Sequence, residues 1–271
     1  MDTVKVRHGT SPVILSIPHS ATWLPDDIAV RLSDHGRRLI DTDWHVDILY
    51  GGLMPEATTV TAGFHRYLID ANRPPGDESL YPGQASTGLV PLTDFDGRAI
   101  WCDGEAPDAD EIAERVARYH TPYHAALAEE IARVRDMHGI AILYDCHSIR
   151  SKVPRLFEGT LPDLNIGTHD GRTCAPEIED LIVEHAKLDP SYNVILNGRF
   201  KGGWTVRHHG RPEDGVHAVQ MELAQSTYLA VEDAPWRYDC DKAAKLRPVL
   251  QDILEALDQA GLARAADGVG A

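Results

Sequence analysis

Short apolar runs that end abruptly in polar residues constrain the fold of this chain more than any other feature of its sequence. The run PVILSIP, residues 12–18, leads directly to His19, and the run AILY, residues 141–144, leads into DCHS, which contains His147. Short continuous apolar runs are typical of strands that are buried on both faces. In open α/β sheets, ligands bind at the carboxyl ends of such strands, so these polar residues are placed where a site is expected.

Helical patterns separate the expected strands along the rest of the chain. Further strands are expected at 58–62, 65–70 and 216–223, and helical patterns at about 25–50, 108–137, 176–188 and 241–260. Asp108 and Glu111 give the second helix a start that resembles a capping box, and Pro122 is expected to kink or split it. The alternation predicts one α/β domain over residues 1–271, with a mixed, largely parallel central sheet and helices on both faces.

Two segments fall outside this regular pattern. Residues 74–107 are rich in Gly, Pro, Asp and Ser and have weak periodicity, which predicts a long ordered loop or lid. The stretch 263–271, ARAADGVGA, is expected to be a frayed tail. Loops of the first kind commonly carry function.

The charge balance limits the partners that this chain can bind. It has 42 acidic and 26 basic residues, a formal net charge of −16, and no Lys/Arg run that relieves the charge locally. Such a field repels phosphate backbones and anionic lipid surfaces, so neither nucleic acid nor a membrane is an expected partner. A small anionic substrate would need a few well-placed arginines. Individual arginines therefore need separate attention.

The compartment follows from what the sequence does not contain. The first twenty residues have only a short apolar run without a small-residue cleavage site, and no segment is long enough to span a bilayer. The four cysteines lie far apart and form no CxxC pair, so we expect reduced thiols and no thiolate zinc site. A cytoplasmic location is predicted, whereas the oligomeric state is not readable.

Residues of metal-site and hydrolytic chemistry recur along the chain. Their order is His19, the acidic cluster DTDWHVD at 41–47, Asn72 with Arg73, His147 and Glu222. A catalytic zinc-type site needs three protein ligands, usually His and carboxylate, and an open position for a water whose pKa the metal lowers. A nearby carboxylate then takes the proton of this water and passes it to the leaving nitrogen. Two histidines, one aspartate and Glu222 as this base would meet these needs.

Substrate-binding candidates lie near these positions in the sequence. Arg73 with Asn72 offers a fork for a substrate carboxylate. Gln220 shares the strand face of Glu222 and is a candidate for binding substrate amide groups. Arg207 is a candidate for polarising the substrate carbonyl or for holding a second carboxylate, with a structural hydrogen-bonding role as its alternative.

Several motifs are specific enough for comparison with a known family. They are PHS at 18–20, DTDWHVD, DANRPP, YHTPYH at 119–124, DCHS and the long segment KGGWTVRHHGRPEDGVHAVQMELAQSTYL. In the same order, from about residue 12 to residue 260, the chain resembles the N-formylglutamate amidohydrolases. The resemblance implies metal-dependent hydrolysis of N-formyl-L-glutamate to formate and L-glutamate, a step of histidine degradation. It also implies a fold similar to that of the zinc carboxypeptidases, and a divalent metal, zinc, as the cofactor.

The resemblance also implies roles for individual residues. The carboxypeptidase order of metal histidine, metal acid, Asn-Arg pair, second histidine and catalytic glutamate makes His19 and His147 metal ligands and Glu222 the general base. The carboxypeptidase spacing of His and Glu three residues apart is missing, because Thr22 follows His19 at that distance.

The acidic ligand must therefore come from elsewhere in the chain. We choose Asp43, and Asp41 and Asp47 remain alternatives.

Five other histidines have no assigned role. His120 and His124 have the i, i+4 spacing of metal ligands, but they lack the glutamate of HExxH and are interrupted by Pro122, which favours pocket walls or packing. The roles of the remaining three stay open; they are His208, His209 and His217.

Other functions compete with this hypothesis. One is a metalloamidase or carboxypeptidase that acts on another N-acyl amino acid, and another is a non-catalytic protein that binds metal or amino acids on the same scaffold. Glu222 argues against the second, because binding alone would not require a general base. A histidine-based phosphohydrolase is disfavoured because a phosphate-binding glycine loop is missing from the sequence.

Overall fold

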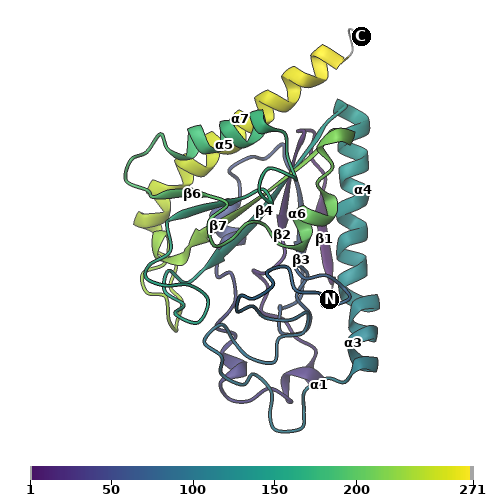
Figure 1. Cartoon of the computed structure of the whole chain (residues 1–271), viewed down its shortest axis with the longest axis vertical. Coiled ribbons are helices and arrows are strands. Elements are labelled where there is room, and N and C mark those ends of the chain that lie inside the picture. The colour runs from purple at the N-terminus through teal and green to yellow at the C-terminus, as the bar shows by residue number, and fades with distance from the viewer. Residues whose placement is uncertain (1, 269–271) are drawn as a thin grey trace.

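The computed structural model, which describes residues 2–268, is built around a seven-stranded sheet with the order β1-β3-β2-β4-β7-β5-β6 (Figure 1). The strands are β1 Val4–Arg7, β2 Val13–Ile17, β3 Thr58–Ala62, β4 Ala141–Ile149, β5 Leu164–Gly167, β6 Val194–Leu196 and β7 Val216–Ala224. β3, β2, β4 and β7 run parallel, and β5 runs parallel to β6, whereas β1 joins β3 and β5 joins β7 antiparallel. The predicted mixed, largely parallel sheet is confirmed.

Helices cover both faces of this sheet, as predicted. They are α1 Asp26–Ala29, α2 Val46–Tyr50, α3 Ala109–Arg115, α4 Thr121–His138, α5 Pro176–Ala186, α6 Trp204–His209 and α7 Cys240–Gly268, with short 3-10 segments at Gly36–Arg38, Pro212–Asp214 and Gln225–Thr227. One core packs α2, α5 and α7 on the face that carries Leu15, Tyr144 and Val219. The other core packs α4 on the face that carries Ile14 and Leu143, and Figure 1 shows α4 along one side with α5 and α7 across another.

The face of the sheet toward α4 changes character along β4 and β7. Both strands are buried at every position, and their parallel register pairs Asp145 with Gln220 and His147 with Glu222. Because side chains alternate with a period of two, these residues follow the apolar Leu143 on the same face. The carboxyl ends of the two central strands therefore bring four polar side chains together at one place.

Several predicted elements are present. Asp108 accepts a hydrogen bond from the backbone N–H of Glu111, as its capping role requires. A π-helical segment, Val116–His120, separates α3 from α4 just before Pro122, which confirms the predicted split. Pro122 lacks a backbone N–H, and helices commonly change their hydrogen-bonding pattern at such positions.

Two predicted elements are wrong. The helix expected at about 25–50 consists of three short helical pieces within turns, because left-handed backbone at Leu39 and His45 interrupts any continuous helix. The strand expected at 65–70 is a turn, in which the backbone N–H of Leu68 donates to the His65 carbonyl. An ion pair between Arg66 and Asp70, 2.6 Å long, spans the same turn.

The segment at 74–107 contains no named helix or strand, only isolated bridges that include Thr93 with Ala99. Its irregular, ordered course agrees with the predicted loop, and its movement as a lid stays a prediction. The tail expected at 263–271 differs, because α7 continues through Gly268 over the good helix formers of ARAA. Residues 269–271 of this expected tail lie outside the described residues.

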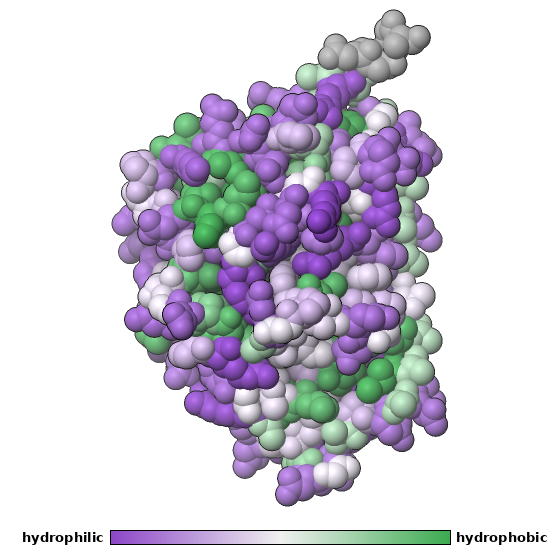
Figure 2. All heavy atoms as spheres, viewed as in Figure 1, coloured by the Kyte–Doolittle hydropathy of each residue, from purple (hydrophilic) through white to green (hydrophobic). Residues whose placement is uncertain are grey.

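The visible surface is mainly hydrophilic, with scattered apolar patches (Figure 2). Among residues 2–268, no helix has both the length and the apolar character needed to cross a bilayer.

Candidate active site

Three side chains predicted as metal ligands converge at the carboxyl end of the sheet. His19 follows β2, Asp43 lies in the turn before α2, and His147 is on β4. Each offers one ligand atom, and these atoms lie within 4.8 Å of one another although all three residues are buried. In the part of the chain that the structure describes, no second group of His, Cys, Asp and Glu converges in this way.

His19 is held by a carboxylate that the sequence reasoning did not single out. Its Nε2 lies 2.8 Å from Oδ1 of Asp70, which also accepts the backbone N–H of Asn72. Its Nδ1 is buried without a hydrogen-bond partner and lies 3.8 Å from Oδ2 of Asp43. A histidine with one nitrogen on a carboxylate and the other free toward a second acid has the arrangement of a metal ligand.

His147 repeats this arrangement. Its Nε2 lies 2.8 Å from Oδ2 of Asp145, and its Nδ1 lies 3.1 Å from Oδ2 of Asp43. If Nε2 donates to Asp145, the lone pair of Nδ1 faces Asp43. The Asp145 carboxylate thus supports the ring from behind, as a partner of a ligating histidine would.

Geometry separates Asp43 from its two alternatives. The Asp43 backbone N–H donates to the His19 carbonyl, and its Oδ2 accepts the backbone N–H of Ser148. Asp41 instead accepts from the Tyr67 hydroxyl, outside the group, and Asp47 is exposed on α2. Only Asp43 of the acidic cluster reaches both histidines.

The charges of this group favour a cation at its centre. Burial alone would lower the pKa of His147, but the carboxylates of Asp145 and Asp43 outweigh it and raise this pKa well above the ordinary value. Burial and the charge of Arg66 lower the pKa of His19. Burial opposes ionisation of Asp43, yet its hydrogen bond to His147 and the neighbouring positive charges lower its pKa. The carboxylates of Asp43, Asp145 and Asp70 around the two rings thus make a positive charge at this place favourable, whether it is a proton on His147 or a metal ion.

Glu222 lies beside this group on β7. Its Oε2 accepts a hydrogen bond of 3.0 Å from Nε2 of Gln220. Burial raises the pKa of Glu222 to about 8; the charges of Asp43 and Asp145 act in the same direction, and that of His147 opposes them. A carboxyl group with a pKa near neutrality can both accept and return a proton under working conditions.

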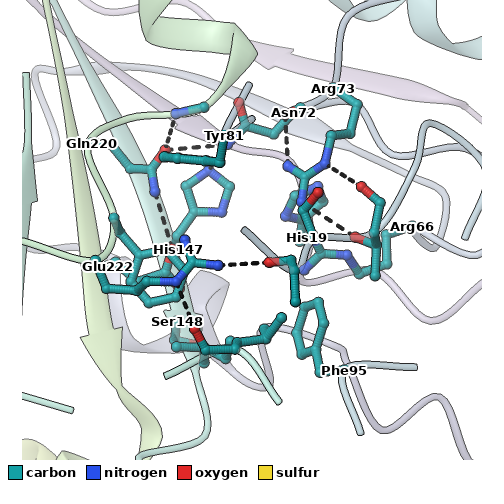
Figure 3. Close-up of a pocket in the computed structure, with 18 residues that line it drawn as sticks. His19, Arg66, Asn72, Arg73, Tyr81, Phe95, His147, Ser148, Gln220 and Glu222 are labelled. Carbon is teal, nitrogen blue, oxygen red and sulfur yellow. Dashed lines mark hydrogen bonds between the residues drawn. The ribbon is translucent and has the colours of Figure 1, made fainter. Parts of the chain in front are cut away.

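These side chains line one pocket, with an empty volume of about 560 Å³ that includes its open mouth. Figure 3 shows Gln220, Glu222 and His147 on one side and Asn72, Arg73 and Arg66 on the other. The loop at 74–107 contributes part of the wall, with Tyr81, Ala85, Ser86, Thr87 and Phe95. A concave pocket with a few convergent polar groups suits a small molecule.

Asn72 and Gln220 reach the pocket, but both side-chain amides already have protein partners. Asn72 Oδ1 accepts the backbone N–H of Thr205, and its Nδ2 donates to Oε1 of Gln220. The same Oε1 accepts the backbone N–H of Gly203. These contacts connect β7 with the turn after β3, and direct contact of either amide with substrate stays a prediction.

The predicted arginines differ in where the structure places them. Arg73 lines the pocket, whereas Arg207 does not. The Arg207 guanidinium donates to the carbonyls of Gly202 and Leu80 and lies over the ring of Tyr81, 5.0 Å from its centroid. The expectation that Arg207 contacts substrate therefore finds no support in this geometry.

Sequence reasoning missed three residues of the site. Asp70 is the first residue of the motif DANRPP and follows the apolar residues Leu68 and Ile69. This change from apolar to polar residues is the signal that could have identified it. Arg66 donates to Asp70 and Asp43 and lines the pocket, and Arg199 lines the pocket from the segment after β6. Neither arginine stands in a recognisable pattern, because long-range folding alone brings it to the site.

We call His19, Asp43 and His147 the metal-like group. The other histidines that the sequence analysis named do not join it. His120 Nε2 lies 2.9 Å from the Arg73 carbonyl, and His124 Nε2 lies 2.8 Å from the Ala71 carbonyl. His209 contacts His124 over 3.0 Å, and Nδ1 of His217 accepts the backbone N–H of Ala175. His120 and His124 thus pack behind the segment at 71–73, as the alternative to metal binding predicted.

Comparison with known proteins agrees with the resemblance read from the motifs. The profile of the N-formylglutamate amidohydrolase family matches residues 11–229. An N-formylglutamate deformylase of Pseudomonas aeruginosa is 44% identical over 94% of this chain and 96% of its own length. An N-formylglutamate deformylase of Pseudomonas putida is 42% identical over 95% of this chain and 96% of its own length. The crystal structure of an N-formylglutamate amidohydrolase from Ralstonia eutropha has a TM-score of 0.77 at 25% identity and covers 98% of both chains.

Proposed function

The chain belongs to the N-formylglutamate amidohydrolase family of hydrolases, and on this premise we propose that it hydrolyses N-formyl-L-glutamate to formate and L-glutamate. The observation that carries the proposal is the convergence of His19, Asp43 and His147 beside Glu222 in one pocket. A hydrolytic site needs these parts: a place for an electrophilic catalyst, a base and a cavity for the substrate.

We include a divalent metal, zinc, in this proposal. Two imidazoles and one carboxylate form a ligand set that zinc accepts in catalytic sites, and the buried Nδ1 of His19 is a donor atom without a protein partner. His19, Asp43 and His147 would hold the metal. When bound there, it would polarise the formyl carbonyl and lower the pKa of a water molecule.

Glu222 moves the proton in this proposal. With its pKa raised to about 8 by burial, the carboxylate form takes a proton from the attacking water and then returns it to the departing amine nitrogen. Gln220 fixes one oxygen of this carboxylate, which restricts its rotation. The pairing of His147 with Glu222 across β4 and β7 sets the distance between base and metal site through backbone register.

Arg73 would bind a carboxylate of the substrate. Its guanidinium is held by the Thr87 carbonyl and hydroxyl and by the Asn72 carbonyl, so the charge is positioned without an acid that would neutralise it. A fixed cation in a pocket reconciles an acidic protein with an anionic substrate. The predicted place in histidine degradation and the predicted cytoplasmic location are part of the same proposal.

Formate release from a panel of substrates tests the proposal. The purified, metal-replete protein is assayed with N-formyl-L-glutamate, N-acetyl-L-glutamate and a dipeptide, by detection of formate or of the free amine. We expect turnover of the formyl compound, with the other two much slower. Faster turnover of the acetyl compound or the dipeptide would favour the alternative activities, and no turnover of the formyl compound would contradict the proposal.

A further inference from the structure

Three arginines line the pocket, and they differ in how their charges are balanced. Arg66 is 3.4 Å from Asp43 and 2.6 Å from Asp70, so two carboxylates compensate it. Arg73 and Arg199 form no ion pair with any acidic residue among residues 2–268, although the chain carries 42 acids against 26 bases. Two cations without an ion-pair partner therefore face one cavity.

Arg199 is held in place by neutral acceptors only. Its Nε donates to the Leu156 carbonyl over 2.7 Å, and its Nη2 donates to the Ala85 carbonyl over 2.8 Å. Its guanidinium also lies over the rings of Tyr81 and Phe200, at 5.3 Å from each centroid. These contacts fix the position of the group and leave its charge available to a ligand.

The surroundings of Arg199 are unfavourable for a lone cation. Burial lowers its pKa and the positive charge of Arg73 lowers it further, while Tyr81 and the charge of Glu222 act in the opposite direction without cancelling the shift. An anion bound between the two arginines would relieve both effects, because it would replace lost hydration and separate like charges.

Arg199 and Arg207 make similar contacts with the loop at 74–107 but differ in whether they line the pocket. Both guanidinium groups lie over Tyr81, and both donate to carbonyls of the same loop, Arg199 to Ala85 and Arg207 to Leu80. Only Arg199 lines the pocket. Holding the loop therefore does not require an arginine in the cavity, and Arg199 has a further role.

We propose that Arg199 binds the side-chain carboxylate of a dianionic N-acyl amino acid, while Arg73 binds the α-carboxylate. The inference rests on the proposed function and makes Arg199 a specificity-determining residue. Arg73 adjoins Asn72, whose Nδ2 lies 3.0 Å from Nε2 of His147, so Arg73 is on the wall next to the metal-like group. The charge of Arg73 acts on Asp70, the carboxylate behind His19, whereas Arg199 is near enough to Glu222 to feel its charge. We therefore give Arg73 the α-carboxylate, which adjoins the scissile bond, and give Arg199, the other pocket arginine without an ion-pair partner, the side-chain carboxylate.

The test compares an acidic substrate with its neutral analogue. The kcat/KM for N-formyl-L-glutamate and N-formyl-L-glutamine is measured in the wild type, Arg199→Gln, Arg73→Gln and Arg207→Gln. We expect Arg199→Gln to lose about 100-fold on the glutamate compound, as for a removed charge partner, and little on the glutamine compound. Arg73→Gln should lose activity on both. Arg207→Gln, the matched control, should keep the wild-type ratio between the two substrates.

Equilibrium binding of the products separates this inference from the proposed function. Calorimetry measures L-glutamate and L-glutamine binding to the wild type and Arg199→Gln, after thermal unfolding has shown that the variant is folded. A preference for glutamate that disappears in Arg199→Gln supports the subsite even if formate release fails. Equal loss on both substrates, or an unchanged preference in both assays, would overturn it.

Discussion

Two groups of histidines lie on either side of the segment at 71–73, and they differ in what faces their ring nitrogens. In the metal-like group, Nε2 of His19 and of His147 lies against a carboxylate, that of Asp70 or Asp145. In the second group, the hydrogen-bond partners of the His120 and His124 rings are backbone carbonyls and another imidazole. We call this second group the histidine cluster; it consists of His120, His124, His208 and His209.

The difference shows how a fold makes one histidine a ligand and another a structural donor. A carboxylate behind the ring strengthens the basicity of the opposite nitrogen and so favours a cation there. A carbonyl behind the ring fixes the tautomer without adding negative charge. Burial lowers the pKa of His124 well below its ordinary value, and its histidine neighbours lower it further. The histidine cluster is thus built to stay uncharged, whereas the metal-like group is built to hold a positive charge.

Among variants that keep the metal, we expect replacement of the base Glu222 to lower kcat the most. Glu222→Gln keeps the size and the contact with Gln220 but cannot take a proton, so kcat should fall by about 100- to 10,000-fold with metal content unchanged. Glu232→Gln is the matched control, because Glu232 binds Ser151 and does not line the pocket. Wild-type kcat in Glu222→Gln would show that another group moves the proton.

Removing the carboxylate behind His19 sharpens the comparison. Asp70→Asn should weaken metal affinity by about 10- to 100-fold, as measured by competition with a chelator. Asp94→Asn is a suitable control, because Asp94 also contacts a histidine, His35, away from the metal-like group. If the two variants bind metal equally well, the carboxylate behind His19 has no influence on metal binding.

A change in the histidine cluster should affect stability without affecting metal. His124→Asn loses the hydrogen bond to the Ala71 carbonyl, so the free energy of unfolding should fall by about 1 to 3 kcal/mol. KM should rise as the segment that carries Arg73 loosens, while the metal stoichiometry stays the same. Metal loss in this folded variant would contradict the distinction between the two groups.

The smallest effect concerns pH. Burial lowers the pKa of His209 to about 3, whereas an unfolded histidine titrates near 6.5. As the pH falls from about 6.5, the unfolded chain takes a proton that the folded chain excludes, so stability decreases. His209→Tyr keeps a donor near His124 and removes this titration. Between pH 7 and pH 5 the free energy of unfolding should fall in both proteins, and the fall should be smaller in His209→Tyr. Because His209 is partly exposed, we expect the difference between the two falls to be only about 1 kcal/mol. Denaturant unfolding at both pH values measures this, and identical pH dependence would count against it.

The sequence predicted the strand-borne part of the site better than the loop-borne part. His147 and Glu222 follow from buried strands whose alternation fixes the face of each side chain, and the parallel register then pairs them. His19 lies two residues after the end of β2, where the buried apolar run gives way to polar residues. The periodicity of apolar residues along a strand and the polar residues at its end are local properties of the sequence. They can therefore be read from a single sequence.

Loop residues depend on contacts that are distant in the sequence. The three aspartates at 41–47 look alike as a helical pattern. The contacts that distinguish Asp43 are made with His19 and His147, which are distant in the sequence. Arg199 and Arg207 both lie over the ring of Tyr81, and only the three-dimensional course of the segments that carry them decides that Arg199 lines the pocket. Neither choice has a periodic or local cause that could be read beforehand.

Metal content of the purified protein, measured together with formate release, tests the central claim most directly. We expect about one zinc per wild-type chain, the ratio that a single site of three protein ligands requires. We further expect loss of both metal and turnover in His147→Ala, and retention of metal in His124→Ala. Metal-free wild type that hydrolyses N-formyl-L-glutamate at full rate, or a His147→Ala variant that keeps stoichiometric metal and activity, would contradict the account.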